Sequence, residues 1–351
     1  MLIFLAIIGL FGLGAYNHQV TAIPVPTPIP PQPIELMAWL PWWDQPAVYT
    51  SLTHAADSLK VISPSWYHLT DENLIALLPS IDPLPVKNLA TTSGLLLMPT
   101  VGNDLDSTKA ADFLADPGHF SPAIDYLMLQ ASASGYHGYD LDFESIPNQY
   151  AFAYTQFLQL LSDRLHAQGL SLSVAVHART GSLNDWELAF SHDYPAIGRL
   201  ADQVRIMAYD FHSQNSPPGP VTPLDNLEAV LIYAIKSIPA PKIVLGLPLY
   251  GYDWPENLPG VSVTFKQAQA NLINYQGSQS RDPLSSAPIG RYNLDGLAHT
   301  IWFEDAQSTL SKVSLARSFG INRFIFWRLG GEDPATWTTL ASASGVLKSG
   351  E

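Results

Sequence analysis

Residues 122–144 read PAIDYLMLQASASGYHGYDLDFE and combine two periodicities. In the first part, apolar residues recur at intervals of three and four as far as Gly135, which predicts an amphipathic helix that this glycine ends. In the second part, polar and apolar residues alternate, which predicts a β-strand. Asp140, Asp142 and Glu144 would all project from one face of that strand, because side chains two apart share a face.

The alternation of helix and strand continues along the chain in both directions. Short apolar runs of strand length recur, and amphipathic stretches lie between most of them. The eight predicted strands are 35–43, 59–67, 94–102, 138–144, 170–178, 203–211, 242–251 and 322–329. Apolar strands with intervening helices indicate a parallel sheet covered on its outer face, and eight such units predict an α/β fold, a (β/α)8 TIM barrel.

One interval interrupts this rhythm. Residues 252 to about 300 separate the seventh and eighth strands by more than a single helix requires. Within the interval, VSVTFKQAQANL (261–272) predicts a helix and GLAHTIWFED (296–305) predicts a strand. We therefore expect a catalytic barrel over 35–345 with a small α+β insertion.

The N-terminal segment predicts export. MLIFLAIIGLFGLGAY is apolar throughout but shorter than the roughly 20 residues of a membrane-spanning helix. Small residues in the following QVTA suit a cleavage site, although the usual Lys or Arg before the apolar core is absent. We interpret residues 1–22 as a signal peptide or, alternatively, a membrane anchor, and residues 23–34 as a Pro-rich linker. The expected location is extracytoplasmic, either secreted or tethered to the membrane or cell wall.

Composition narrows the classes of function. The 351-residue chain has 17 Lys and Arg against 31 Asp and Glu, a formal net charge of −14, and no cysteine. A nucleic-acid partner is not expected, because phosphate binding depends on clustered Lys and Arg. The lack of cysteine excludes disulfides, thiolate catalysis and zinc–thiolate sites. We expect a monomer that acts on a neutral or cationic substrate.

The three acids fall at the end of the predicted fourth strand, and barrel active sites lie at the carboxyl ends of the strands. Because crowded carboxyls cannot all ionise, Glu144 is a candidate general acid. A solvated loop is disfavoured by the apolar Leu141 and Phe143 on the opposite face. A Mg²⁺ or Ca²⁺ site is the other alternative, but no nearby His or second acidic cluster completes a shell. We expect no metal and no organic cofactor.

HGYDLDFE, residues 137–144, resembles D-G-x-D-x-D-x-E, the fourth-strand signature of the family 18 glycoside hydrolases, which include chitinases and peptidoglycan-directed N-acetylglucosaminidases. Further segments that resemble this family are MAYDF (207–211), LGLPLYGYDW (245–254) and FIFWRLGGED (324–333). ISPSWY (62–67) and IWFEDAQS (301–308) are similar to its spore and cell-wall branch. His137 replaces the first Asp of the signature, where it would either neutralise the acids or have a structural role.

The resemblance implies a glycosidase that cleaves β-linked N-acetylglucosamine polymers, such as chitin or peptidoglycan, by a retaining, substrate-assisted mechanism. Glu144 would act first as general acid and then as general base, while the N-acetyl carbonyl of the substrate attacks the anomeric carbon. Asp142 would hold the acetamido N–H, and Asp140 would modulate the proton shared among the acids. Tyr209 and Asp210 would contact the acetamido oxygen.

The resemblance and the strand ends also suggest substrate contacts. Trp327 would form the floor of the sugar site, because an aromatic face suits the apolar face of a pyranose. Arg328 would recognise a substrate carboxylate or pair with Glu332. The further candidates are Trp43, Asn103, Met207 and Tyr250. His177 is interpreted as a core histidine. A lectin-like sugar-binding protein and a metal-dependent hydrolase are the alternative functions, and the retention of Glu144 favours an enzyme.

Overall fold

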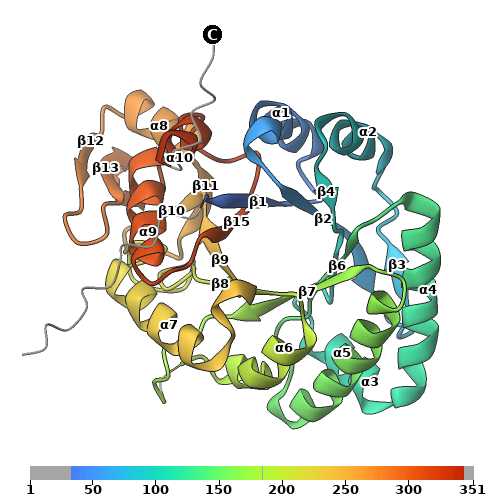
Figure 1. The fold of residues 1–351 in the computed structure, drawn as a ribbon. Helices are drawn as coiled ribbons and strands as arrows, with labels where there is room; N and C mark the ends of the chain where they lie inside the picture. The colour runs from blue at the N-terminus through green and yellow to red at the C-terminus, as the bar shows by residue number, and fades with distance from the viewer. Residues whose placement is uncertain (1–32, 184, 344–351) are drawn as a thin grey trace, which may run out of the picture. The chain divides into compact units, whose positions relative to one another are not determined.

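Parallel strands form a closed barrel in the computed structural model, which describes residues 33–183 and 185–343 (Figure 1). The barrel strands are β1 (Glu35–Leu40), β2 (Val61–Leu69), β4 (Leu96–Leu97), β5 (Thr100–Gly102), β6 (Gly138–Asp142), β7 (Ser171–His177), β8 (Gln203–Met207), β9 (Ile243–Pro248) and β15 (Arg323–Trp327). They pair in this order, with β4 and β5 as two parts of the third strand, and β15 pairs with β1 to close the ring. The predicted eight-stranded (β/α)8 barrel is confirmed.

Helices cover the outer surface of the barrel (Figure 1). They are α1 (Gln45–Ala55), α2 (Leu84–Ser93), α3 (Ser107–Ala115), α4 (Phe120–Ser134), α5 (Ala151–His166), α6 (Tyr194–Leu200), α7 (Leu224–Ser237), α9 (Ala306–Ser318) and α10 (Thr336–Ala343). In α5, the buried stripe of Tyr154, Phe157, Leu158, Leu161 and Leu165 has the three-and-four spacing of one helix face. A short strand, β3 (Ile75–Leu77), pairs antiparallel with β2.

Two glycines let bulky or main-chain groups approach closely inside the barrel. A Cβ atom at Gly138 would overlap the carbonyl oxygen of Ser171 on the neighbouring strand, so the glycine of the fourth-strand motif is required. A Cβ atom at Gly246 would lie 3.1 Å from the ring of Trp39. The Trp39 ring therefore occupies the barrel interior, where it packs with methionines and aliphatic side chains.

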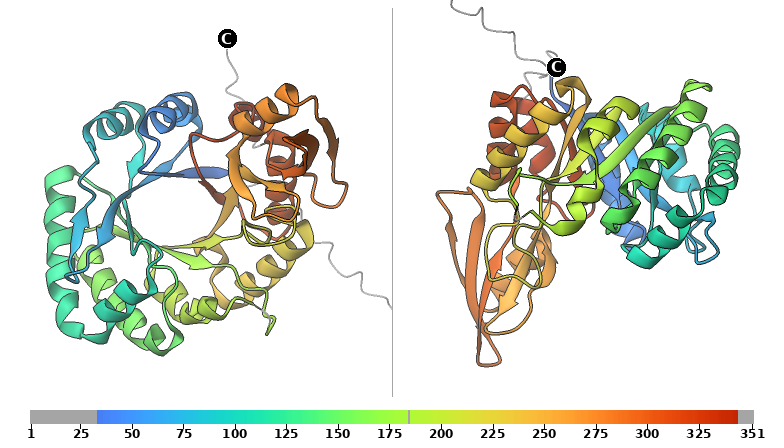
Figure 2. Two further views of the ribbon diagram at one scale, coloured as in Figure 1. Left: turned by 180° about the vertical axis from the view of Figure 1, so that it is seen from behind. Right: turned by 90° about the horizontal axis from the view of Figure 1, so that it is seen from below.

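The insertion is an antiparallel sheet with one helix, and it stands away from the barrel (Figure 2). Its elements are β10 (Tyr250–Pro255), β11 (Val261–Thr264), α8 (Phe265–Asn274), β12 (Ser278–Arg281), β13 (Pro288–Leu294) and β14 (Leu297–Trp302). The sheet order is β11-β10-β14-β13-β12. The insertion thus begins at Tyr250, earlier than predicted. The helix predicted from 261 starts only at Phe265, because VSVT forms a strand and Thr264 caps the helix.

The predicted signal peptide or anchor, residues 1–22, lies outside the described residues, and so does the linker up to residue 32. Over the part of the chain that the structure describes, no helix is both long and apolar enough to cross a membrane.

Candidate active site

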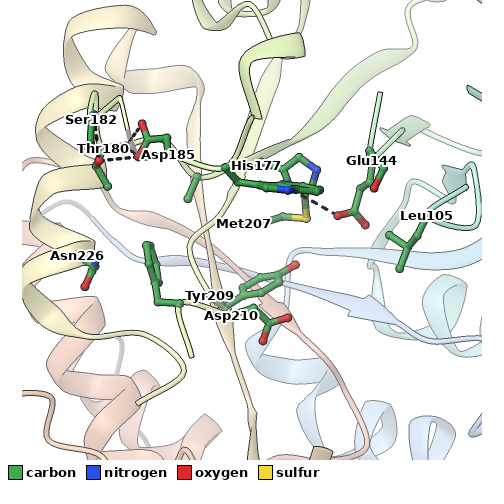
Figure 3. Close-up of a pocket in the computed structure, with 14 residues that line it drawn as sticks. Leu105, Glu144, His177, Thr180, Ser182, Asp185, Met207, Tyr209, Asp210 and Asn226 are labelled. Atoms are coloured by element: carbon green, nitrogen blue, oxygen red, sulfur yellow. Dashed lines mark hydrogen bonds and ion pairs between the residues drawn. The ribbon is translucent and has the colours of Figure 1, made fainter. Parts of the chain in front are cut away.

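A cleft of about 560 Å³ opens at the carboxyl ends of the barrel strands (Figure 3). The segments that follow β5, β6, β7 and β8 form most of its wall. Residues that line it include Glu144, His177, Trp186, Met207, Tyr209 and Asp210. The cleft therefore brings together four of the residues selected from the sequence, Glu144, Met207, Tyr209 and Asp210, which come from two separate strands.

Glu144 is held in the cleft through its main chain. Asn103, buried just after β5, accepts a hydrogen bond from the Glu144 N–H at 2.8 Å and donates one to the Glu144 carbonyl oxygen at 2.7 Å. Burial raises the pKa of Glu144 to about 7, and the charge of Asp210 adds to the shift. The carboxyl can thus exchange a proton near neutral pH. Asn103 was a candidate sugar contact in the sequence. Its side-chain amide instead forms hydrogen bonds with the main chain of Glu144.

Asp140 lies deeper in the barrel, where its carboxylate is fully buried. It accepts hydrogen bonds from Trp39 Nε1 at 2.7 Å, Ser173 Oγ at 2.6 Å and Thr100 Oγ1 at 3.2 Å. Arg205 of β8 forms an ion pair with it at 3.0 Å and is also fully buried. Sequence reasoning missed Arg205, although a lone Arg in an apolar barrel strand signals a buried acidic partner. Asp140 therefore acts as an electrostatic support of the site.

Asp142 lies on β6 between the buried ion pair and Glu144. Its Oδ1 atom is buried and finds no hydrogen-bond partner among the described residues. Burial raises the pKa of Asp142 well above its usual range, and the charges of Glu144 and Asp140 raise it further, while Arg205 opposes the shift. Asp142 thus favours its protonated form, and its unpaired oxygen is suited to a polar group of a ligand.

Tyr209 and Asp210 follow β8 and face the acids across the cleft (Figure 3). Asp210 accepts hydrogen bonds from the hydroxyls of Tyr250 at 2.5 Å and Tyr252 at 3.0 Å, both on β10 of the insertion. Burial raises the pKa of Asp210, and the two tyrosine hydrogen bonds oppose the shift. The Tyr250 hydroxyl, predicted to contact a sugar, thus donates a hydrogen bond to Asp210, and the insertion helps to position this carboxylate.

Aromatic rings gather at the end of β15. Trp327 lies edge-on to Trp39, with ring centroids 6.3 Å apart, and edge-on to Trp43, with centroids 5.9 Å apart. Trp43 is half exposed. The predicted floor of the sugar site is therefore part of a tryptophan cluster that reaches from the barrel interior to the surface.

Arg328 lies next to Trp327. One of its two predicted partners was Glu332, but the two side chains do not form an ion pair. Its Nη1 atom lies 3.8 Å from Asp44 Oδ2, and its guanidinium lies 5.3 Å from the centre of the Trp43 ring. Glu332 instead accepts hydrogen bonds from Trp337 Nε1 and from the main chain of the two preceding glycines. Recognition of a substrate carboxylate by Arg328 stays a prediction.

Two residues of the cleft were not among the site residues selected from the sequence, where His177 was interpreted as a core histidine and Trp186 was not considered. His177 ends β7, and its Nδ1 atom lies 3.6 Å from Glu144 Oε2. Trp186, in the loop after β7, packs edge-on against the His177 ring at 4.4 Å and is half exposed. The position of His177 at the carboxyl end of a barrel strand was the available signal. Nothing in the sequence marks Trp186, because a loop residue reaches the cleft only through the fold.

Residues 52–332 match the family described as glycosyl hydrolases family 18. The chain belongs to this family. It is 32% identical over 231 residues to the cortical fragment-lytic enzyme of Bacillus subtilis (strain 168), which covers 64% of this chain and 54% of that protein. The family 18 chain thus spans about half the length of this curated relative.

Two solved structures resemble the family 18 barrel closely. The spore cortex-lytic enzyme of Bacillus cereus has a TM-score of 0.80 and 27% identity, and the match covers 88% of this chain and 74% of that one. A chitinase from Chromobacterium violaceum ATCC 12472 has a TM-score of 0.81 and 27% identity, and the match covers 90% of this chain and 99% of the other. The family resemblance inferred from the motifs is confirmed.

His137, where this chain leaves the family 18 signature, lies at the opposite end of β6 from Glu144. Its ring Nδ1 atom accepts a hydrogen bond from the Leu97 N–H at 3.1 Å. The main-chain N–H of His137 donates to the Leu97 carbonyl oxygen at 2.9 Å. The side chain thus joins the start of β6 to β4, which supports the structural alternative. It does not neutralise the acids; the cation that pairs with Asp140 is Arg205.

Within residues 33–183 and 185–343, no three His, Asp or Glu side chains are grouped so that they could hold a metal ion. The acids of the site have protein partners instead: Asp140 pairs with Arg205, and Asp210 accepts from two tyrosines.

Proposed function

We propose that this family 18 chain is a glycosidase that cleaves β-linked N-acetylglucosamine polymers by a retaining, substrate-assisted mechanism. The observation that carries the proposal is Glu144, a cleft carboxyl whose pKa is raised to about 7 by burial and by Asp210. Such a group can give and recover a proton at neutral pH. Family membership and relatives described as a cortical fragment-lytic enzyme and a chitinase support the same class of reaction.

In the first half of the reaction, Glu144 donates its proton to the glycosidic oxygen as the bond from that oxygen to the anomeric carbon breaks. The acetamido carbonyl oxygen of the substrate forms a new bond to the anomeric carbon, which gives an oxazolinium ion. The unpaired Oδ1 of Asp142 would accept the acetamido N–H, and the Tyr209 hydroxyl would donate to the acetamido oxygen. The contact to the acetamido N–H strengthens as positive charge develops on the oxazolinium, whereas the tyrosine contact orients the acetamido oxygen for attack.

In the second half, the ionised Glu144 takes a proton from a water molecule, whose oxygen attacks the anomeric carbon and opens the oxazolinium ring. Two displacements restore the original configuration. The buried Asp140–Arg205 pair keeps the charge beneath the site fixed during both halves. Trp327 would support the sugar ring from the end of β15.

The acetamido requirement admits chitin, peptidoglycan and related glycans, and the printed names of the relatives include enzymes of spore cortex as well as chitinases. We propose a glycan of this class as the substrate and, from the N-terminal sequence, an extracytoplasmic site of action for a monomer. A metal-dependent hydrolase would differ in losing turnover when a chelator is added.

The test is to incubate the purified chain with chitooligosaccharides and with peptidoglycan and to measure new reducing ends. Glu144→Gln should lower turnover by about 100-fold or more, because the general acid is lost. Glu228→Gln, on the exposed face of α7, is the matched control and should leave turnover unchanged. Binding of oligosaccharide without turnover by the native chain would favour the lectin-like alternative. Full turnover by Glu144→Gln would contradict the mechanism.

A further inference from the structure

His177 faces the catalytic carboxyl from the neighbouring strand (Figure 3). Its Nδ1 atom lies 3.6 Å from Glu144 Oε2, and the side chains are 13% and 20% exposed. The other ring nitrogen, Nε2, is buried without a hydrogen-bond partner among the described residues. Trp186 covers the ring edge-on. Nδ1 is therefore the nitrogen through which this histidine can interact, and Glu144 is the group in front of it.

A second histidine fixes this arrangement. His192 is fully buried and follows the 3₁₀ helix Glu187–Ser191. Its Nδ1 atom accepts a hydrogen bond of 3.1 Å from the main-chain N–H of His177. Its Nε2 atom lies 3.1 Å from the Phe143 carbonyl oxygen, which can only accept, so Nε2 carries the hydrogen. His192 thus ties the main chain at the end of β7 to the residue before Glu144. The imidazole and the carboxyl face each other because of the fold and need no ligand to bring them together.

Neighbouring groups influence the ionisation of Glu144 and His177. Asp210 and Tyr209 face Glu144 from the segment after β8, and Asp142 precedes it on β6. Burial, followed by the nearby His192, lowers the pKa of His177 well below its usual range. The ring is therefore neutral at neutral pH, so it can act on Glu144 as a hydrogen-bond donor and not through a positive charge.

We propose that His177 is a positioning residue that donates its Nδ1 hydrogen to the ionised Glu144 and holds this carboxylate for water activation. The inference deepens the proposed function and rests on it. A protonated Glu144 has no need of this donor, which fits the separation of 3.6 Å. After Glu144 gives up its proton, a shift of less than about 1 Å brings the two atoms to the length of a charge-assisted hydrogen bond. The ring keeps its hydrogen throughout.

A pair of variants separates this role from simple packing. His177→Leu removes the donor at similar volume, whereas His177→Asn keeps an N–H donor near the position of Nδ1. In His177→Leu the pKa on the alkaline limb of kcat/KM should rise by about one unit, because only the ionised Glu144 loses a hydrogen bond. Its kcat should fall by about 10-fold or more. His177→Asn should restore the limb. An unmoved limb in His177→Leu, or an Asn variant that behaves like Leu, would overturn the proposal.

A measurement on the native chain does not depend on the folding of a variant. In a pH titration followed by nitrogen-15 NMR, His177 should stay neutral with the hydrogen on Nδ1, and its Nδ1 shift should change near the pKa of Glu144. The inflection should vanish in Glu144→Gln and persist in Glu228→Gln. A ring with the hydrogen on Nε2, or no inflection, overturns the inference. A clear inflection in a chain without glycosidase activity would contradict the proposed function alone.

Discussion

At the scale of single residues, three equally spaced acids acquire three different environments. Asp140 is buried and paired with Arg205, so its charge is compensated. Asp142 has one buried oxygen, Oδ1, without a hydrogen-bond partner among the described residues, and Glu144 reaches the cleft. The partners on neighbouring strands, rather than the spacing, decide which carboxyl carries a proton.

Replacing Asp210 should shift the pH profile in a defined direction. The charge of Asp210 helps to raise the pKa of Glu144, so Asp210→Asn should lower that pKa. Since the first half of the reaction needs protonated Glu144, the alkaline limb of kcat/KM should move to lower pH, by about one unit or less. Asp225→Asn, exposed at the start of α7, is the control. A limb that stays in place or moves upward would contradict the assignment.

Breaking the buried ion pair should reduce stability. Asp140→Asn leaves Arg205 as an unpaired charge in the barrel interior, and we expect the free energy of unfolding to fall by about 3–5 kcal/mol. The double variant Asp140→Asn/Arg205→Met removes the stranded charge and should recover part of the loss. Denaturant unfolding of the three proteins measures both effects. Equal stabilities of the native chain and Asp140→Asn would refute the structural role of the pair.

At the scale of elements, the segments after the strands support the acid from both sides. Asn103, after β5, binds the N–H and carbonyl of Glu144, and His192, beyond β7, binds the carbonyl of the preceding residue. A general acid needs such support, because a displacement of about 1 Å can lower the rate by about 100-fold. The loops therefore act on the carboxyl through its backbone.

Asn103 provides a test of this idea. Asn103→Ala removes both hydrogen bonds to the Glu144 backbone, and we expect kcat to fall by about 10- to 100-fold while KM stays nearly constant. Asn103→Asp keeps the acceptor for the Glu144 N–H but sets a carboxylate oxygen against the Glu144 carbonyl oxygen, so it should not restore kcat. Steady-state kinetics on a chitooligosaccharide distinguish the two roles of this residue. A raised KM with unchanged kcat would show that Asn103 binds sugar, as its position in the sequence suggested.

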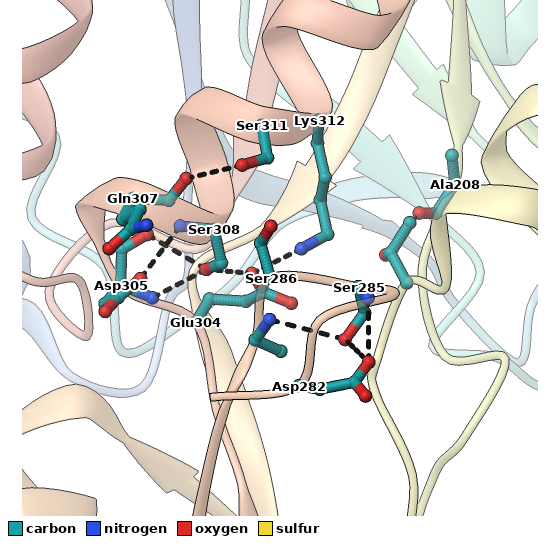
Figure 4. Close-up of polar contacts among 12 residues, drawn as sticks. Ala208, Asp282, Ser285, Ser286, Glu304, Asp305, Gln307, Ser308, Ser311 and Lys312 are labelled. Atoms are coloured by element: carbon teal, nitrogen blue, oxygen red, sulfur yellow. Dashed lines mark hydrogen bonds and ion pairs between the residues drawn. The ribbon is translucent and has the colours of Figure 1, made fainter. Parts of the chain in front are cut away.

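At the scale of the whole barrel, polar contacts hold Glu304, which follows the last strand of the insertion, against α9 (Figure 4). Arg281 of β12 pairs with Asp305, which caps α9, at 2.5 Å. Glu304 and Lys312, both nearly inaccessible, form an ion pair at 2.6 Å, and Ser308 donates to the same carboxylate oxygen. The Glu304 N–H also donates to the Tyr250 carbonyl oxygen at 3.2 Å, so this junction adjoins the strand that carries Tyr250 and Tyr252.

The junction can be tested by removing one charge or both. Lys312→Met leaves Glu304 buried without its cation, and we expect a loss of about 3–5 kcal/mol in the free energy of unfolding. The double variant Glu304→Gln/Lys312→Met should be close to native stability, because no unpaired charge remains. Lys236→Met, exposed on α7, is the matched control. A single variant as stable as the native chain would contradict the importance of the pair.

From the amino-acid sequence alone, the barrel and the family were predicted, and both are confirmed; Glu144 was marked as the candidate acid. Local periodicity is enough for the barrel, because strand alternation and helix spacing follow from backbone geometry, whereas the family came from the resemblance of HGYDLDFE and the other motifs. It also marked Tyr209, Asp210 and Met207, which fall at the end of one predicted strand. It did not predict where the helix of the insertion begins, since the strand β11 and the capped helix α8 share one short segment.

The groups that surround these acids became visible only in the folded barrel. Asp140 and Arg205 lie 65 positions apart and meet because β6 and β8 face the same barrel interior. Asn103 turned from a candidate sugar contact into a support of Glu144, and His177 turned from a core residue into a neighbour of the same carboxyl. The physical reason is that burial and long-range partners set both the position and the pKa of a side chain, and neither is encoded in local sequence spacing.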